Sequence, residues 1–92
     1  MTLVQLRHFV VLAEQASFVQ ASKVLYLTQP ALTRSIQALE DELGGRLFDR
    51  LGRRIARTPF GTEVLQRARR LVADAESLKQ TGKGLHAGLI GT

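Results

Sequence analysis

The chain has 92 residues, 45% of them hydrophobic, a size that suits one small domain with a modest core. It has no cysteine, which excludes a disulfide framework and a cysteine-ligated zinc site. Thirteen lysines and arginines stand against eight acids, so the formal net charge is +5. No apolar run approaches the roughly 20 residues of a membrane span, and the N-terminus lacks a secretion signal, so we expect a cytoplasmic location and no membrane partner.

The first predicted helix begins at a capping box. Thr2 and Gln5 have the spacing in which each side chain binds the backbone N–H of the other residue. The apolar residues that follow recur at helical spacing: Leu6, Phe9, Val10 and Ala13. We therefore expect a helix through about residue 16, with one side packed on a core.

The second predicted helix is short. Ser17 and Gln20 repeat the pattern of a helix start. Four residues are predicted to form its inner face: Phe18, Ala21, Val24 and Leu25. The chain then has to change direction near residues 26 and 27, because Thr28 is a further N-cap residue.

The third predicted helix has an apolar side and a polar leading end. Thr28 caps it, Pro30 falls in its first turn, where the missing N–H is not needed, and Gly44 ends it. Its apolar row has the spacing of a helix on a core: Leu32, Ile36, Leu39 and Leu43. The acids at residues 40–42 would repel a phosphate backbone, so the N-terminal turns are expected to meet an anion. A short helix, a tight turn and a longer helix follow the order of a helix-turn-helix.

Two very short strands are predicted after this helix. They cover residues 48–50 and 55–57, and the glycine-containing stretch 51–54 between them forms the tip of a hairpin. Between Arg46 and Arg57 the sequence has five arginines and one acid. Such a local basic face indicates a polyanionic partner, with a merely solvated charged surface as the alternative. Beside a helix-turn-helix, this hairpin is a wing.

The last predicted helix is long. Thr58 and Pro59 form a strong helix start, and we expect the helix to run to about residue 81, before Gly82, Gly84 and Gly88. Its length, roughly 35 Å, exceeds what so small a domain can cover. One apolar stripe runs along it: Val64, Leu65, Ala68, Leu71, Val72, Ala75 and Leu78. This pattern predicts dimerisation with the same helix of a second copy, and packing on its own domain alone is the alternative.

The predicted fold is mainly α: a winged helix-turn-helix of three helices and a short two-stranded wing, followed by a long dimerisation helix. The DNA-binding domain would cover residues 1–58, the linker and dimerisation helix residues 59–81, and a hinge residues 82–92. Leu89 and Ile90, in the glycine-rich end of the chain, are interpreted as the approach to a strand of a further domain.

Together these segments resemble the N-terminal DNA-binding region of the LysR-type transcriptional regulators. The resemblance covers residues 3–80 and rests on LRHFVVLAEQASFVQASKVLYLTQPALTRSIQALEDELGGRLFDR, then GRR, then TPFG. It implies that an effector-binding domain, absent here, binds a small-molecule inducer, and that this fragment needs no cofactor. The sequence departs from the family pattern at Gln20, where a basic residue is common, and at Phe60, where a small or polar residue is common. Gly45 after Gly44 is expected to loosen the turn into the wing.

The second helix of a helix-turn-helix lies in the DNA major groove with its N-terminal residues at base edges. Gln29 can pair with adenine through its amide, and Arg34 can bind guanine O6 and N7 together. The resemblance implies the same face, since the family reads bases from its Gln-Pro-x-x-x-Arg segment. The predicted base-contacting residues, some of which can also reach phosphates, are Gln29, Pro30, Ala31, Thr33, Arg34 and Gln37.

The remaining contacts are predicted to hold the DNA backbone. Arg53 and Arg54 at the wing tip suit a narrow, AT-rich minor groove. The other predicted backbone contacts are Arg50, Arg57, Lys23, Arg7 and Thr28, the last mainly a helix cap.

The predicted function is a sequence-specific transcriptional regulator that binds double-stranded DNA at an inverted repeat as a homodimer, or as a tetramer in the full-length protein. The alternative is a helical protein-interaction module that uses the long helix, with arginines that only aid solubility. A membrane-surface helix is weaker still, because Glu63, Asp74 and Glu76 interrupt its cations.

An enzyme is not expected. His8 and His86 lie far apart in the sequence, and no pair of acids accompanies either. No glycine-rich loop precedes a helix in a phosphate-binding pattern, and no set of metal ligands is present. We interpret His8 as a helix-surface residue.

Overall fold

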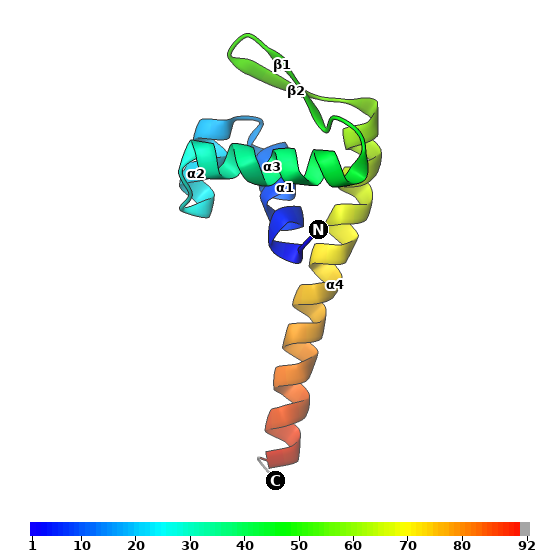
Figure 1. Cartoon of the computed structure of the whole chain (residues 1–92). Helices are drawn as coiled ribbons and strands as arrows, with labels where there is room; N and C mark the ends of the chain where they lie inside the picture. Colours follow the sequence, from blue (N-terminus) through cyan, green and yellow to red (C-terminus); the bar gives the residue numbers. More distant parts are fainter. Residues whose placement is uncertain (91–92) are drawn as a thin grey trace.

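The computed structural model describes residues 1–90 and consists of four helices and a two-stranded sheet. The elements, in chain order, are α1 (Leu3–Gln15), α2 (Phe18–Leu25), α3 (Gln29–Leu43), β1 (Phe48–Leu51), β2 (Arg54–Arg57) and α4 (Pro59–Ile90). The first three helices gather beside the first part of α4, and the rest of α4 projects away from them (Figure 1). The wing and the far end of α4 therefore lie at opposite ends of a molecule 58 Å long.

All four helices begin at the predicted hydroxyl caps. The Thr2 hydroxyl accepts from the backbone N–H of Gln5 and the Gln5 side chain accepts from that of Thr2, both at 3.1 Å, so the capping box is confirmed. Ser17 and Thr28 cap α2 and α3 at 3.2 Å, and the Thr58 hydroxyl accepts from the backbone of α4 at 2.8 Å. Each bond satisfies an N–H group that has no partner inside the helix.

The core forms where α1 packs against the three other helices. Its buried apolar residues are Leu6, Phe9, Val10, Leu12, Ala21, Leu32, Ile36, Leu39, Leu47, Phe48, Leu65 and Ala68. The rings of Phe9 and Phe48 meet edge to face with centroids 5.5 Å apart, which attaches the base of the wing to α1. The predicted apolar rows of α1 and α3 are confirmed, with Leu43 and Ala13 half-buried at the border.

The prediction that Val24 belongs to the inner face of α2 is wrong. Val24 is 51% exposed, and Ser22 is buried in its place with its hydroxyl donating to the Val19 carbonyl at 2.9 Å. Successive helix residues turn by about 100°, so Ser22 and Val24 lie on nearly opposite sides. The short helix can present only one of them to α1 and α3.

The wing is an antiparallel hairpin, slightly longer than predicted. Phe48 pairs with Arg57 and Leu51 with Arg54, so only Gly52 and Arg53 form the turn. Gly52 has a φ of +64°, a conformation that glycine adopts at little cost. Arg54 belongs to β2 rather than to the tip, and Arg53 alone occupies the turn with the glycine.

The predicted end of α4 near residue 81 is wrong. The helix continues through Gly82, Gly84 and Gly88 to Ile90, so the predicted hinge and strand are helical as far as residue 90, while residues 91 and 92 lie outside the described residues. A glycine costs about 1 kcal/mol in a helix relative to alanine, but it keeps the N–H and C=O that the helix needs. Between these glycines stand good helix formers such as Leu85 and Ala87, so the hydrogen-bond ladder continues. No helix within residues 1–90 is long and apolar enough to cross a membrane.

Candidate nucleic-acid interface

The exposed side of α3 is polar along its N-terminal turns. Gln29, Pro30, Arg34 and Gln37 are exposed and Thr33 is half-buried, on a side of the helix that begins next to the buried row at Gln29 and ends opposite it at Arg34. Helical spacing puts these five residues within one arc, while Ala31 falls at its edge and is half-buried. Five of the six predicted base contacts thus share a face, and the sixth borders it.

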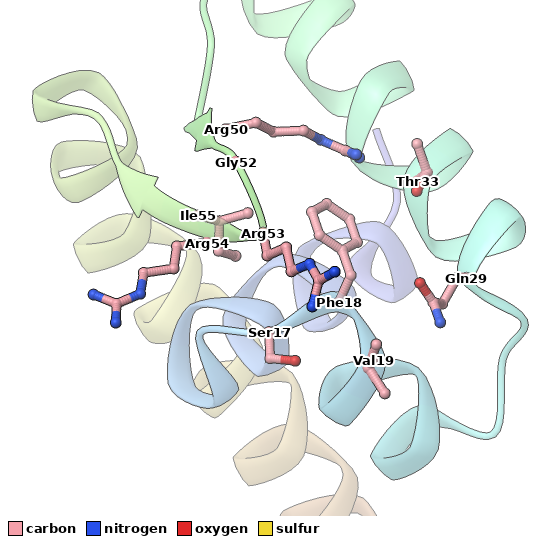
Figure 2. A pocket seen from close by; sticks show the side chains of 10 residues that line it. All are labelled: Ser17, Phe18, Val19, Gln29, Thr33, Arg50, Gly52, Arg53, Arg54 and Ile55. Carbon is pink, nitrogen blue, oxygen red and sulfur yellow. The ribbon is translucent and has the colours of Figure 1, made fainter.

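A concave surface separates this face from the wing. Ten residues of α2, α3 and the hairpin line a cavity of about 330 Å³: Ser17, Phe18, Val19, Gln29, Thr33, Arg50, Gly52, Arg53, Arg54 and Ile55. Figure 2 shows Gln29 and Thr33 on one side of it and the arginines of the hairpin on the other. The side chains of Arg50 and Arg53 extend over the hollow, whereas that of Arg54 points away (Figure 2). The fold therefore joins two predicted contact regions into one basic, concave surface.

Arg50 is held in place by an aromatic ring. Its guanidinium carbon lies 4.7 Å from the centroid of the Phe18 ring. Such a cation–π contact stabilises by about 0.5–1 kcal/mol at an exposed site, enough to favour one orientation of a long side chain. Sequence reasoning gave Phe18 only a core role, because nothing local links it to an arginine in the wing.

Two of the arginines predicted to contact DNA, Arg7 and Arg57, make contacts within the protein. The Arg7 guanidinium bonds to Glu76 of α4 in an exposed ion pair, and the DNA contact of Arg7 stays a prediction. That hydrogen bond and its charge lower the pKa of the Glu76 carboxyl. The Arg57 guanidinium donates to the Thr62 hydroxyl at 3.2 Å, and Lys23 is exposed on α2.

The acidic end of α3 has structural roles that its sequence did not indicate. A Glu40 carboxylate oxygen accepts from the backbone N–H of Leu47 at 2.7 Å, in a partly buried position. Glu42 pairs with the N-terminal amine of Met1 at 2.7 Å. Two of the three acids thus fasten the ends of neighbouring segments to α3, in addition to keeping this end negatively charged.

The His8 side chain projects from α1 toward α3, so the prediction that it lies on a free helix surface is wrong. Its Nδ1 atom is 2.7 Å from the Ser35 hydroxyl, on the side of α3 away from the exposed polar face. Burial lowers the pKa of His8, because the charged imidazolium loses hydration there. The contact connects α1 to α3 at Ser35, the residue that follows Arg34 in the sequence.

The predicted apolar stripe of α4 divides into two sides. Leu65 and Ala68 are buried in the core of their own chain, so their predicted role in a dimer surface is wrong. Val64, Val72 and Ala75 are half-buried, while Leu71 and Leu78 are 47% and 72% exposed. Leu85 and Leu89 continue the exposed side toward the end of the helix. An apolar recess of about 180 Å³ lies beside it, lined by Met1, Leu6, Leu43, Val64, Arg67, Ala68 and Leu71.

Within residues 1–90, no group of three or more histidine, aspartate or glutamate side chains could hold a metal ion. The assembled features are a helix with an exposed polar side, an arginine-bearing hairpin and a basic hollow between them. This combination defines a winged helix-turn-helix protein whose site suits a polyanion.

Comparison with known proteins identifies the family. The sequence matches "Bacterial regulatory helix-turn-helix protein, lysR family" over residues 3–62. A relative from Pseudomonas sp. (strain ATCC 19151), "SDS degradation transcriptional activation protein", is 52% identical over 75 residues, which are 82% of this chain and 24% of that protein.

Two solved structures are similar throughout. The BenM DNA-binding domain, in a complex with catB site 1 DNA, is 38% identical with a TM-score of 0.90, and the match covers 96% of this chain and 95% of that one. The CbnR DNA-binding domain in its DNA complex is 35% identical with a TM-score of 0.87, covering 94% and 99%.

The chain belongs to the LysR family of bacterial regulatory helix-turn-helix proteins. The family resemblance and the winged helix-turn-helix fold predicted from the sequence are confirmed. The chain spans between 24% and 63% of the length of three curated relatives that it matches.

Proposed function

We propose that this chain is the DNA-binding part of a transcriptional regulator, with α3 in the major groove and the wing against the neighbouring minor groove. The observation that carries the proposal is that the polar side of α3 and the arginines of the hairpin border one concave surface (Figure 2). Its support from relatives is that the similar BenM and CbnR domains were crystallised with DNA. Because those similar domains were crystallised with DNA, DNA is the polyanion we infer for this surface.

Base recognition is assigned to the exposed side of α3. Arg34 can donate two hydrogen bonds to guanine O6 and N7, and the Gln29 amide can pair with adenine. Thr33 and Gln37 lie on the wing side of the same face and reach either a base or a phosphate. Pro30 and Ala31 supply apolar contact, with Ala31 at the edge of the groove-facing arc.

The DNA backbone is assigned to the hollow between α3 and the wing. Arg50 is the residue we assign to a phosphate of the strand that separates the two grooves, and its contact with Phe18 at the hollow supports this assignment. Arg53 at the turn is the residue we place in the minor groove, since Arg54 points away from the hollow (Figure 2). Thr28 acts first as the cap of α3, and Lys23, Arg54 and Arg57 contribute to phosphate contacts at the border.

Dimerisation is assigned to the exposed apolar side of α4. Val64, Leu71, Leu78 and Leu85 recur every seven residues, the spacing that keeps an apolar row against a second helix. The recess beside Val64 and Leu71 offers space for a side chain of the partner. A two-fold dimer carries two α3 helices and reads an inverted repeat.

In the whole protein, we propose a cytoplasmic regulator whose small-molecule inducer binds outside these residues, since a curated relative is far longer than this chain. The expected absence of a cofactor in the DNA-binding part belongs to the same proposal.

Selection of bound sequences from a random DNA pool tests the proposed function. Base reading by a dimer predicts that the selected sequences share an inverted repeat. A single unpaired half-site among the selected sequences would contradict the dimer, and no enrichment over the starting pool would contradict base reading. A gel-shift titration of the selected duplex against a scrambled one, at two salt concentrations, separates specific from electrostatic binding.

A further inference from the structure

The connection between α3 and α4 begins with two consecutive glycines. Gly44 and Gly45 follow the last residue of α3, and Gly44 has a φ of +79°, where it closes the helix. Two consecutive glycines ordinarily leave a chain free to swivel, because neither has a Cβ to restrict its backbone. Few direct contacts join α3 and α4 within the described residues, and both pack on α1. The shared packing on α1 sets the general direction of α3 relative to α4, and the contacts of this glycine pair are a further, direct connection between the two helices.

The ring of Phe60 provides one brace. A Cβ added to Gly45 would lie 2.8 Å from two carbons of that ring, a distance that real side chains do not tolerate. The ring, in the first turn of α4, thus packs directly on the backbone that follows α3. Gly45 does not have a positive φ, so no special backbone conformation requires glycine there, and in this structure its missing side chain provides space for Phe60.

The backbone of Leu47, two residues after Gly45, is held from the end of α3 and from the residue that caps α4. The Leu47 N–H donates to the Glu40 carboxylate of α3 at 2.7 Å, and the Leu47 carbonyl accepts from the Thr58 N–H at 3.0 Å. Gly61 approaches that carbonyl so closely that an added Cβ would lie 2.2 Å from its oxygen. These contacts fasten the beginning of α4 to the loop, and the packing of Phe60 on Gly45 extends the brace to the end of α3.

We propose that Phe60, packed on Gly45, is a positioning residue that fixes the direction of α3 relative to α4, and with it the half-site spacing that the dimer accepts. The proposal rests on the proposed function, since it requires a dimer joined through α4. One added base pair moves a half-site by about 3.4 Å and also turns it around the DNA axis. A braced connection resists this displacement of α3, whereas a freely swivelling glycine pair would follow it.

The test measures binding to duplexes that carry the selected inverted repeat with its spacer shortened by one base pair or lengthened by one or two. The wild-type chain is expected to prefer one spacing by on the order of tenfold. Phe60→Ala and Gly45→Ala should each reduce this preference to about threefold or less, while their binding to a single half-site stays unchanged. Equal half-site binding also shows that the recognition surface of each variant is folded.

The double variant Gly45→Ala/Phe60→Ala separates ring packing from a general loosening. An alanine at residue 45 displaces the ring in the wild-type background, but it meets no ring once residue 60 is alanine. Gly45→Ala should therefore change the spacing preference strongly in the first background and little in the second. Phe60 is 40% exposed and Val24 is 51% exposed. Val24→Ala, which removes a comparably exposed apolar side chain away from Gly45, is therefore the matched control and should keep the wild-type preference.

Failure of the proposed dimeric function and failure of the role of Phe60 give different results. A wild-type chain that binds the inverted repeat no more tightly than a single half-site would overturn the proposed dimeric function itself, whereas tight binding without a spacing preference would overturn the brace. A wild-type chain with a sharp preference, retained unchanged in both single variants, would overturn the role of Phe60 and Gly45 while leaving the dimer intact. Additive effects of the two substitutions would likewise contradict the contact between them as the cause.

Discussion

The two long helices, α3 and α4, divide their side chains in different ways. Every apolar residue in the row of α3 faces the core of its own chain, and the opposite side is polar. In α4 the apolar residues face two directions: Leu65 inward, and Leu71, Leu78 and Leu85 outward. A helix of the first kind offers hydrogen-bonding groups to a polar partner, whereas one of the second kind still has apolar surface to bury. This comparison predicts that α3 binds DNA and that α4 packs against the same helix of a second copy.

The largest effect should come from the inward side of α4. Leu65→Ala removes a side chain that is 2% exposed, and it should lower the free energy of unfolding by about 2–5 kcal/mol. Urea titration followed by circular dichroism, at one fixed protein concentration, measures the change. Leu85→Ala, on the outward side of the same helix, is the control, and equal losses from both would remove the distinction between the two sides.

The outward side should affect association. Leu78 is 72% exposed, so Leu78→Asp should leave the fold intact but weaken dimerisation by about tenfold or more, because a charge would be buried at the interface. Sedimentation equilibrium over a range of concentrations measures the dimer constant. Gln80→Asp adds the same charge about 200° away around the helix and should have little effect. Dimerisation that survives Leu78→Asp would exclude this side of α4 as the interface.

A smaller effect is expected from the glycines of α4. Gly82→Ala and Gly84→Ala should each increase the stability of the far part of the helix by about 0.5–1 kcal/mol, because alanine loses less backbone entropy than glycine. Open space surrounds both positions, so the added methyl groups meet no neighbour. Hydrogen exchange of the amides after residue 81 reports the change, and faster exchange in the variants would count against a helix there.

The smallest effect concerns pH and the core side of α3. Burial lowers the pKa of His8 below its ordinary value of 6.5, so the unfolded chain takes up a proton more readily than the folded chain. The stability that depends on neutral His8 is fully present above the unfolded-state pKa of about 6.5. It is lost as the pH falls from there through the lower pKa of the folded state. Urea midpoints at pH 8, 6 and 5 should decline more in the wild type than in His8→Phe. Parallel declines would assign the pH dependence to other groups.

Local rules explain why so much of the fold could be predicted from the sequence. Thr2, Ser17, Thr28 and Thr58 each cap a helix through neighbours within three residues, and the rows of α1 and α3 follow from helical spacing. The predicted helix end at residue 81 was wrong because the glycines that follow lower the local helix propensity only moderately, and the helix formers between them outweigh that cost.

The contacts that sequence reasoning missed join distant segments. Arg50 lies over Phe18, His8 meets Ser35, Glu40 binds Leu47 and Arg7 binds Glu76. No periodic pattern marks such pairs, since each residue alone is compatible with a solvent-exposed role. The DNA-contacting residues on α3 and the wing remain predictions, although the fold now gathers most of them on one surface.

The most direct test of base reading by α3 compares Arg34→Ala with Arg53→Ala on the selected duplex and on a random duplex of equal length. Arg34→Ala should weaken binding to the selected duplex by about 1–3 kcal/mol, leave binding to the random duplex nearly unchanged, and relax the preference at one base pair. Arg53→Ala should weaken binding to both duplexes more evenly and reduce the slope of log affinity against log salt by about 1. An equal loss on both duplexes with Arg34→Ala would contradict the claim that the exposed side of α3 reads bases.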